Sequence, residues 1–245
     1  MKKIIFSFDD GLLDFYENVF PVLKKYKIKA TLNVITGFTD KTVKTNYNCC
    51  SVSQLQEMLE YGIELTNHSN DHLFPESLNG YDKAQKKLRG WFPECKISGV
   101  VTPYTQAVPD NFSKWCKLNK IKYVRLGETE HLNSIQRFLT KTRIISRFRF
   151  YCHNNSHYSK NKGIVVVNSF PVFENKSVDY YARIISLCHL RPNITLFFHS
   201  IVKDETEIGK CIYPETAWTV SKFEELIKWI LNNGYKICRQ IDTIK

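Results

Sequence analysis

The chain has 245 residues and a formal net charge of +11, and 43% of its residues are hydrophobic. This length and apolar content suit one α/β domain with a sizeable core, and the absence of low-complexity tracts excludes a disordered chain. No stretch reaches the ~20 apolar residues of a spanning helix, and eight scattered cysteines without a Cys-x-x-Cys pair indicate reduced thiols rather than a disulfide framework.

Strands and helices alternate along most of the sequence, which predicts a mostly parallel sheet, either open or closed into a barrel. Apolar runs predict strands at residues 3–8, 30–35, 63–67, 96–101, 122–126, 163–168, 194–198 and 235–238. Helical spacing of apolar residues predicts helices at 15–26, 51–60, 78–89, 110–119, 178–189 and 220–232. Residues 128–162 break this alternation, so we interpret them as an irregular basic insertion in a single domain spanning residues 1–245.

The polar residues that could carry chemistry all follow predicted strands. Asp9 and Asp10 come after the first strand, His68 and His72 after the third, and His199 after the seventh. In a parallel α/β barrel these strand ends open on one face, where active sites lie. We therefore expect segments about 190 residues apart in the sequence to form one site.

Two imidazoles and a carboxylate are typical of a mononuclear metal site. Asp10, His68 and His72 suit Zn²⁺, with Co²⁺, Mn²⁺, Ni²⁺ or Fe²⁺ as alternatives. Such a metal lowers the pKa of bound water toward about 7. Asp9 could then accept a proton from that water, and His199 could donate one to a leaving nitrogen. The sequence thus predicts a metal-dependent hydrolase.

Three motifs resemble those of the polysaccharide deacetylases with NodB homology, carbohydrate esterase family 4. Ser-Phe-Asp-Asp-Gly at residues 7–11 is similar to the family's Thr-Phe-Asp-Asp-Gly. His-Ser-Asn-Asp-His at 68–72 is similar to His-Ser/Thr-x-x-His, and Leu-Phe-Phe-His at 196–199 to Leu-x-x-His. The resemblance covers essentially the whole chain. It implies a distorted (β/α)7 barrel of parallel strands with helices outside.

The resemblance also implies a role for each matched residue. Asp9 would be the catalytic base and His199 the acid, while Asp10, His68 and His72 would hold the metal. A further motif places Pro103 and Tyr104 at the site, and the backbone N–H of Tyr104 would help to stabilise the oxyanion. Pro103, Leu196 and Trp218 are candidate substrate contacts, with Trp218 offering a ring that could stack on a sugar.

The sequence departs from the family pattern at two places. Val101 stands where the Arg-x-Pro-Phe/Tyr motif has the arginine that steadies the base aspartate. Arg125 ends the next predicted strand, so we expect its guanidinium to replace that arginine near Asp9. The family's fourth motif supplies an aspartate that tunes the acidic histidine, and residues 167–170 occupy its place without one.

These observations predict removal of an N-acetyl or N-formyl group from an amino sugar on an intracellular nucleotide-, lipid- or oligosaccharide-linked substrate. The alternatives are an amidohydrolase of a non-sugar linear amide and a metal-binding module without turnover. Five Lys and Arg residues between positions 137 and 149 form a solvated face, or a surface for a phosphate-linked substrate or an anionic membrane. No motif indicates nucleic-acid binding. Because acidic residues interrupt the first apolar run, we expect a cytoplasmic protein, with peripheral membrane association as an alternative.

Overall fold

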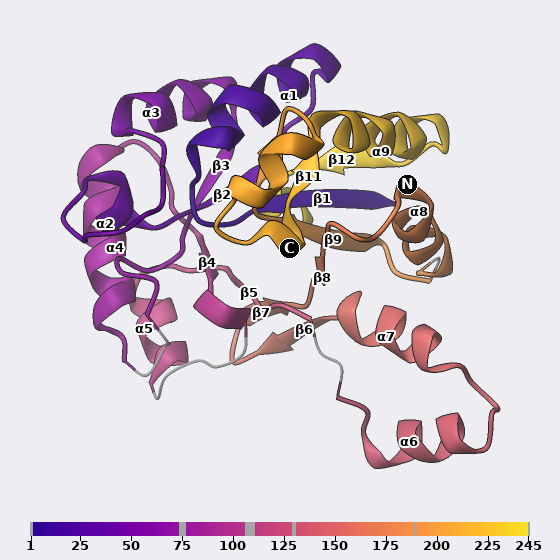
Figure 1. Cartoon of the computed structure of the whole chain (residues 1–245). Coiled ribbons are helices and arrows are strands. Elements are labelled where there is room, and N and C mark those ends of the chain that lie inside the picture. The colour runs from indigo at the N-terminus through magenta and orange to yellow at the C-terminus, as the bar shows by residue number, and fades with distance from the viewer. Residues whose placement is uncertain (1, 74–76, 106–110, 129–130, 189, 245) are drawn as a thin grey trace.

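A curled, mostly parallel sheet forms the centre of the computed structural model, and helices pack around its outside (Figure 1). The structure describes residues 2–73, 77–105, 111–128, 131–188 and 190–244. The strands are β1 (Lys3–Phe8), β2 (Thr31–Val34), β3 (Glu64–Asn67), β4 (Gly99–Val101), β5 (Tyr123–Arg125), β6 (Tyr158–Asn161), β7 (Ile164–Val167), β8 (Phe170–Pro171), β9 (Asn193–Phe198), β10 (Ile201–Val202), β11 (Trp218–Thr219) and β12 (Lys236–Cys238). The helices are α1 (Phe20–Tyr26), α2 (Thr36–Thr39), α3 (Val52–Tyr61), α4 (Asn79–Trp91), α5 (Phe112–Leu118), α6 (Ser134–Lys141), α7 (Arg147–Asn155), α8 (Val178–Leu187) and α9 (Val220–Asn232).

The sheet curls into the distorted barrel that the sequence predicts. Its strands run in the order β6-β7-β5-β4-β3-β2-β1-β9-β8, and β12 pairs with the first half of β1. Strand β7 pairs with β5, whereas β8 pairs with β9, and only residues 168–169 separate β7 from β8. If β7 and β8 count as two halves of one bent strand, seven strand positions circle the barrel. The (β/α)7 prediction is therefore confirmed.

Aromatic packing joins the sheet to the last long helix. Phe6, Phe8 and Phe198 point from β1 and β9 toward Phe223 of α9, with ring centroids 5.3–5.7 Å from that ring. All four rings are completely buried. Alternate residues of a strand face opposite sides, so burying one side this way leaves the next residues along β1 to face the barrel interior. This packing fixes the strand that carries the paired aspartates.

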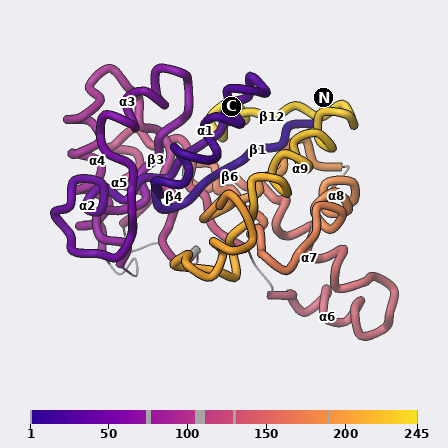
Figure 2. Tube along the Cα trace, turned by 45° about the horizontal axis from the view of Figure 1, so that its top comes forward, coloured from indigo at the N-terminus to yellow at the C-terminus, as the bar shows by residue number. Residues whose placement is uncertain are grey.

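Residues 128–162 are more regular than the sequence predicts. They contain α6, α7 and β6, and β6 forms an antiparallel hairpin with β7. Helix α6 extends away from the barrel in both views (Figures 1 and 2), whereas α7 packs against α8 and buries Phe150 and Cys152. Because no side chain of α6 is buried, the segment lacks the strong apolar run that identifies a core helix. The prediction of an irregular insertion is wrong for this reason.

None of the described helices has the length and apolar character needed to cross a lipid bilayer.

Candidate metal centre and catalytic site

The candidate residues meet at the carboxyl ends of neighbouring strands, as expected. Phe8 of β1 lies beside Phe198 of β9, so Asp9 and His199 follow at the same level of the barrel. The Asp9 backbone N–H donates to the Phe198 carbonyl over 2.9 Å. Strand β3 ends at Asn67 directly before His68. Parallel pairing with a fixed register brings these distant segments to one edge of the sheet.

Asp10 lies in a left-handed turn that directs its carboxylate toward two imidazoles. Its φ is 70°, and that of the following Gly11 is 66°. The carboxylate Oδ1 of Asp10 is 3.3 Å from Nε2 of His68 and 3.4 Å from Nε2 of His72. Among the described residues these three form the only cluster whose ligand atoms all lie within 4.8 Å of one another. The predicted triad is therefore present.

Backbone contacts orient both histidines. Nδ1 of His68 lies 3.0 Å from the Val101 carbonyl, which makes Nδ1 the protonated nitrogen and leaves Nε2 free to bind. The backbone N–H of His72 donates to the Ser69 hydroxyl over 3.0 Å, while Asn67 in turn accepts from the Ser69 N–H. The turn after β3 thus presents two Nε2 atoms to one carboxylate.

The donor set fits a divalent cation. Both carboxylate oxygens of Asp10 are buried and accept no hydrogen bond from any described residue, although a buried carboxylate costs free energy unless it is paired. Burial alone would raise the pKa of Asp10, but its contact with His68 and the charges of His199 and His72 lower this pKa to about 2. Burial and repulsion from His68 lower the pKa of His72 to about 4. An ionised carboxylate beside a neutral imidazole is the form in which both bind metals.

Arg125 contacts Asp9, as the sequence predicts. Its Nη2 lies 2.7 Å from Oδ1 and 2.6 Å from Oδ2 of that carboxylate. Both side chains are almost completely buried. Arg125 pairs with Val101 across β4 and β5, so a side chain from either position faces the same region. The guanidinium therefore occupies the place of the arginine that the motif at Val101 lacks.

Three further residues hold this ion pair, and none of these contacts was predicted from the sequence. Asn33 donates to Asp9 Oδ1 over 2.5 Å. Ser169 accepts from Arg125 Nη1 over 3.1 Å, and the guanidinium lies 4.5 Å from the centre of the Phe197 ring. Asn33 is a polar residue inside a buried strand, a signal that could have identified it. Ser169 falls in the 167–170 segment that replaces the fourth motif, but its contact with Arg125 depends on the fold.

His199 lies on the opposite side of the centre without a tuning carboxylate. Its Nδ1 is buried and has no hydrogen-bond partner in the described part of the chain. This observation agrees with the lack of an aspartate in the fourth motif. The imidazole packs instead 5.4 Å from the Tyr213 ring.

Aromatic side chains line the mouth of the centre. Tyr104 is 51% exposed, and its ring centroid lies 4.9 Å from that of His72. Pro103 beside it is buried and begins the helical turn Pro103–Thr105. The hydroxyls of Tyr47 and Tyr213 form a short hydrogen bond. Neither of these two tyrosines was predicted, because both come from loops without a motif.

Two predicted substrate contacts are wrong in this structure. Trp218 is completely buried, and its indole N–H donates to the Phe173 carbonyl over 2.9 Å. Leu196 is also fully buried within β9. Both side chains belong to the core between the sheet and its covering helices. They present no surface to a ligand.

Comparison with known proteins gives the same family as the motifs. Residues 1–112 match the family described as polysaccharide deacetylase. A poly-β-1,6-N-acetyl-D-glucosamine N-deacetylase of Staphylococcus epidermidis is 41% identical over 71 residues, which are 29% of this chain and 25% of that protein. The matched segments span between 25% and 29% of the length of the curated relatives to which the chain is similar.

Solved structures share the fold over the whole chain. A family 4 acetyl xylan esterase of Clostridium thermocellum, in complex with a cobalt ion, has a TM-score of 0.56 at 14% identity and covers 98% of this chain and 89% of its own. A Bacillus anthracis protein described as a family 4 pseudoenzyme has a TM-score of 0.58 at 10% identity and covers 100% and 66%. Because an esterase and a pseudoenzyme both share it, the fold alone does not decide turnover. The chain is thus similar to the polysaccharide deacetylase family over residues 1–112, and it shares the fold of a family 4 esterase over nearly all of its length, with the motif residues assembled as described.

Proposed function

We propose that this protein is a metal-dependent de-N-acetylase of N-acetylated amino-sugar polymers or oligomers. The observation that carries the proposal is the buried Asp10 carboxylate, which has no hydrogen-bond donor and faces two oriented imidazoles beside the ion pair of Asp9 and Arg125. A site built only for stability would satisfy these oxygens. The staphylococcal relative favours a β-1,6-linked N-acetylglucosamine polymer over the soluble linked sugars that the sequence suggested.

Asp10, His68 and His72 would hold the cation, with Zn²⁺ or Co²⁺ as our candidates. When bound, such a cation acidifies water and polarises an amide carbonyl. Asp9, held by Arg125 and Asn33, accepts the proton of the attacking water as it adds to the amide carbon. The carbon–nitrogen bond then breaks, the amine leaves with a proton from His199, and acetate is released.

Pro103 and Tyr104 border the region in which the acyl oxygen of the substrate would become negatively charged. The φ of Tyr104 is 52°, a left-handed conformation within the turn Pro103–Thr105 that follows strand β4. Pro103 fixes the approach to this turn. We infer that the N–H donates to the oxyanion, while the exposed phenol borders the sugar ring.

The test is acetate release by the purified, metal-loaded protein from four substrates. These are β-1,6-linked and β-1,4-linked N-acetylglucosamine oligomers, a nucleotide-linked N-acetylglucosamine and an N-acetylated amino acid. Release from an oligomer, absent in Asp9→Asn, is the expected outcome. Release only from the amino acid would favour an amidohydrolase of non-sugar amides.

Metal binding without release from any substrate would favour a binding module. One specific observation favours the binding module. His199 Nδ1 has no hydrogen-bond partner among the described residues. The surroundings of Asp9 argue against it, because a binding module has no use for a base held in a buried ion pair.

A further inference from the structure

The segment from residue 131 to residue 173 has an unusual charge. It contains seven Lys and Arg residues and no Asp or Glu. Most of these cations lie on α6, α7 and the turn between them, here called the arm (residues 134–155), of which α6 extends away from the barrel (Figures 1 and 2). In the described part of the chain, none of the cations of this segment lies within ion-pair distance of a carboxylate. The arm therefore presents an uncompensated positive surface.

Helix α6 is amphipathic but buries no side chain. Ile135, Phe138 and Leu139 lie on one face at the i, i+3, i+4 spacing, and Arg137 and Lys141 lie on the other. Ile135 is 71% exposed and Phe138 61% exposed. An apolar face of this kind on a stable monomer normally packs against a core.

Local interactions form this helix without help from the core. Asn133 and Gln136 make a reciprocal capping box at its first turn. Gln136 also donates to the Asn154 side chain over 3.0 Å, which ties α6 to α7. Ile144, in the turn after the helix, is 66% exposed and extends the apolar face. The fold thus builds an ordered helix whose apolar side is left open.

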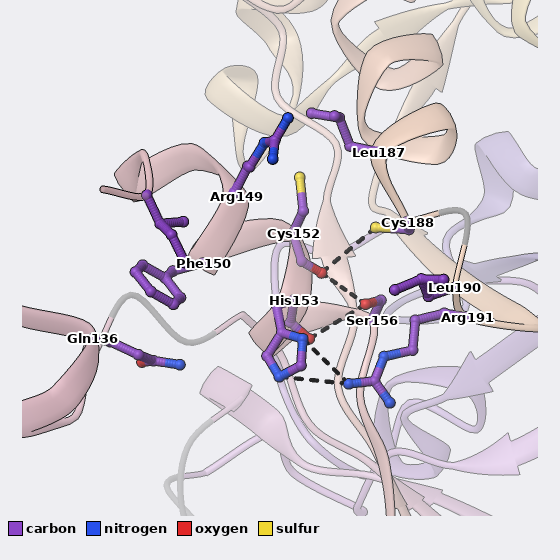
Figure 3. A pocket seen from close by; sticks show the side chains of 11 residues that line it. Gln136, Arg149, Phe150, Cys152, His153, Ser156, Leu187, Cys188, Leu190 and Arg191 are labelled. Carbon is purple, nitrogen blue, oxygen red and sulfur yellow. Dashed lines mark hydrogen bonds between the residues drawn. The ribbon is translucent and has the colours of Figure 1, made fainter. Parts of the chain in front are cut away.

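A cleft continues this surface between α7 and α8. It has a volume of about 430 Å³. Ile145, Phe150 and Leu187 supply apolar walls, and Leu190, 84% exposed, lies at its rim. Figure 3 shows Arg191 directed toward the His153 ring, with Nη2 3.3 Å from Nδ1 and 3.5 Å from Nε2. Arg149 also lines the cleft (Figure 3). Cationic groups therefore border an apolar space beside the open face of α6.

We propose that α6, its following turn and this cleft form a docking surface for an anionic phospholipid bilayer. The apolar face of a basic amphipathic helix inserts at the headgroup boundary, while its cations contact lipid phosphates. The volume and apolar walls of the cleft would admit part of an acyl chain, and Arg149 and Arg191 at its border would contact lipid phosphates. Charge complementarity selects this partner, because a basic surface would be repelled and a neutral one would not be attracted. The inference does not rest on the proposed deacetylase activity.

The experiment is sedimentation of the full-length protein with two kinds of vesicle. One contains equal phosphatidylglycerol and phosphatidylcholine, and the other contains phosphatidylcholine alone. We expect partitioning onto the anionic vesicles to be at least roughly tenfold stronger, and to fall when salt screens the charges. The triple variant I135S/F138S/I144S should lose this binding. Leu118→Ser is the matched control, because Leu118 is 74% exposed on α5, outside the arm.

A second variant tests whether the cations of the docking surface contribute to binding. R143Q/R147Q should weaken anionic binding by about fivefold per cation removed. K83Q/K117Q removes two exposed charges outside the arm and should leave binding unchanged. Circular dichroism checks that every variant is folded.

Three results would overturn the proposal. The first is equal binding of the unmodified protein to both vesicles, or to neither. The second is unchanged binding by the triple variant. The third is a dimer in sedimentation velocity that the triple variant dissolves without any vesicle binding, which would assign the apolar face to a second copy of the chain.

Discussion

Two carboxylates at opposite ends of the barrel have contrasting surroundings. Glu64 begins β3, and it accepts hydrogen bonds from Tyr123 over 2.7 Å, from Thr31 over 2.8 Å and from the Ile241 N–H over 3.0 Å. Asp10 follows β1 at the other end and accepts none from the described residues, although it is the more deeply buried of the two. Hydrogen-bond donors satisfy the Glu64 carboxylate at one end of the barrel, whereas the Asp10 carboxylate at the other end stays available to a ligand. A buried acidic group whose hydrogen-bond partners are missing therefore indicates a functional site.

Replacing a metal ligand at the Asp10 end of the barrel should have the largest effect on metal content and turnover. Asp10→Asn or His72→Ala should empty the metal site and reduce turnover to background, because each removes one of three ligands. Elemental analysis and acetate release measure both effects. Without metal, Asp10→Asn should melt lower than the unmodified protein, because the contact with His68 and the charges of His199 and His72 stabilise the ionised carboxylate in the folded state. Full metal occupancy in His72→Ala would disprove the assigned ligand set.

Asp9→Asn should reduce turnover by about 10²–10⁴-fold while metal content stays normal. The amide keeps the shape of the side chain but cannot accept the proton of the attacking water. Single-turnover kinetics on an N-acetylglucosamine oligomer, together with elemental analysis, separates the two effects. Near-normal turnover would mean that another group is the base.

His199→Ala should cost about 10²-fold on an amide but much less on 4-nitrophenyl acetate. An amine leaves poorly without a proton, whereas nitrophenolate leaves as an anion. The ratio of the two rates is therefore the measurement. An equal loss on both substrates would assign His199 to positioning instead of proton donation.

Arg125→Met should lower turnover by about 10–100-fold, the usual effect of losing an orienting partner. It should also destabilise the fold by about 3–5 kcal/mol, because it leaves the Asp9 carboxylate buried without its cation. The double variant D9N/R125M should regain most of that stability. Urea denaturation of the four proteins in this cycle provides the test, and additive losses would show that the pair is not coupled.

Glu64→Gln should have the smallest effect and should leave metal content and turnover unchanged. Burial raises the pKa of Glu64 despite its hydrogen bonds. The folded state therefore holds this proton more tightly than the unfolded state, whose pKa is about 4.3. Stability from this group is complete below that pH and declines as the pH rises through the raised value. The Gln variant should lack this decline in denaturation midpoints measured from pH 4 upward.

The sequence predicts the metal triad and Arg125 for the same physical reason. Motif spacing identifies the ligands, and strand alternation places the end of β5 beside the end of β4. Both inferences need only the order of parallel strands. Contacts that depend on irregular geometry were missed, as Ser169 shows, since it reaches Arg125 only because the chain bends between β7 and β8.

Predictions failed where local pattern and tertiary environment disagree. Trp218 has the chemistry of a sugar-stacking residue, but tertiary packing buries its ring completely. Helix α6 is eight residues long and has no buried residue, so its three apolar positions gave too short a periodic signal. Local hydrogen bonds of its capping box, rather than core burial, specify where it begins.

The chain bends at residues 168–169, and the hydrogen-bonded ring of strands is interrupted there; we call this interruption the seam. Elsewhere around the ring neighbouring strands are joined by ladder hydrogen bonds, whereas here one strand leaves its first partner and joins its second. Ser169 lies at this seam, donates to the Leu126 carbonyl over 2.6 Å and contacts Arg125. If the strands of the barrel move apart at this point, Ser169 separates from the guanidinium that holds Asp9. Closure of the barrel and alignment of the catalytic base Asp9 therefore depend on the same residue, Ser169.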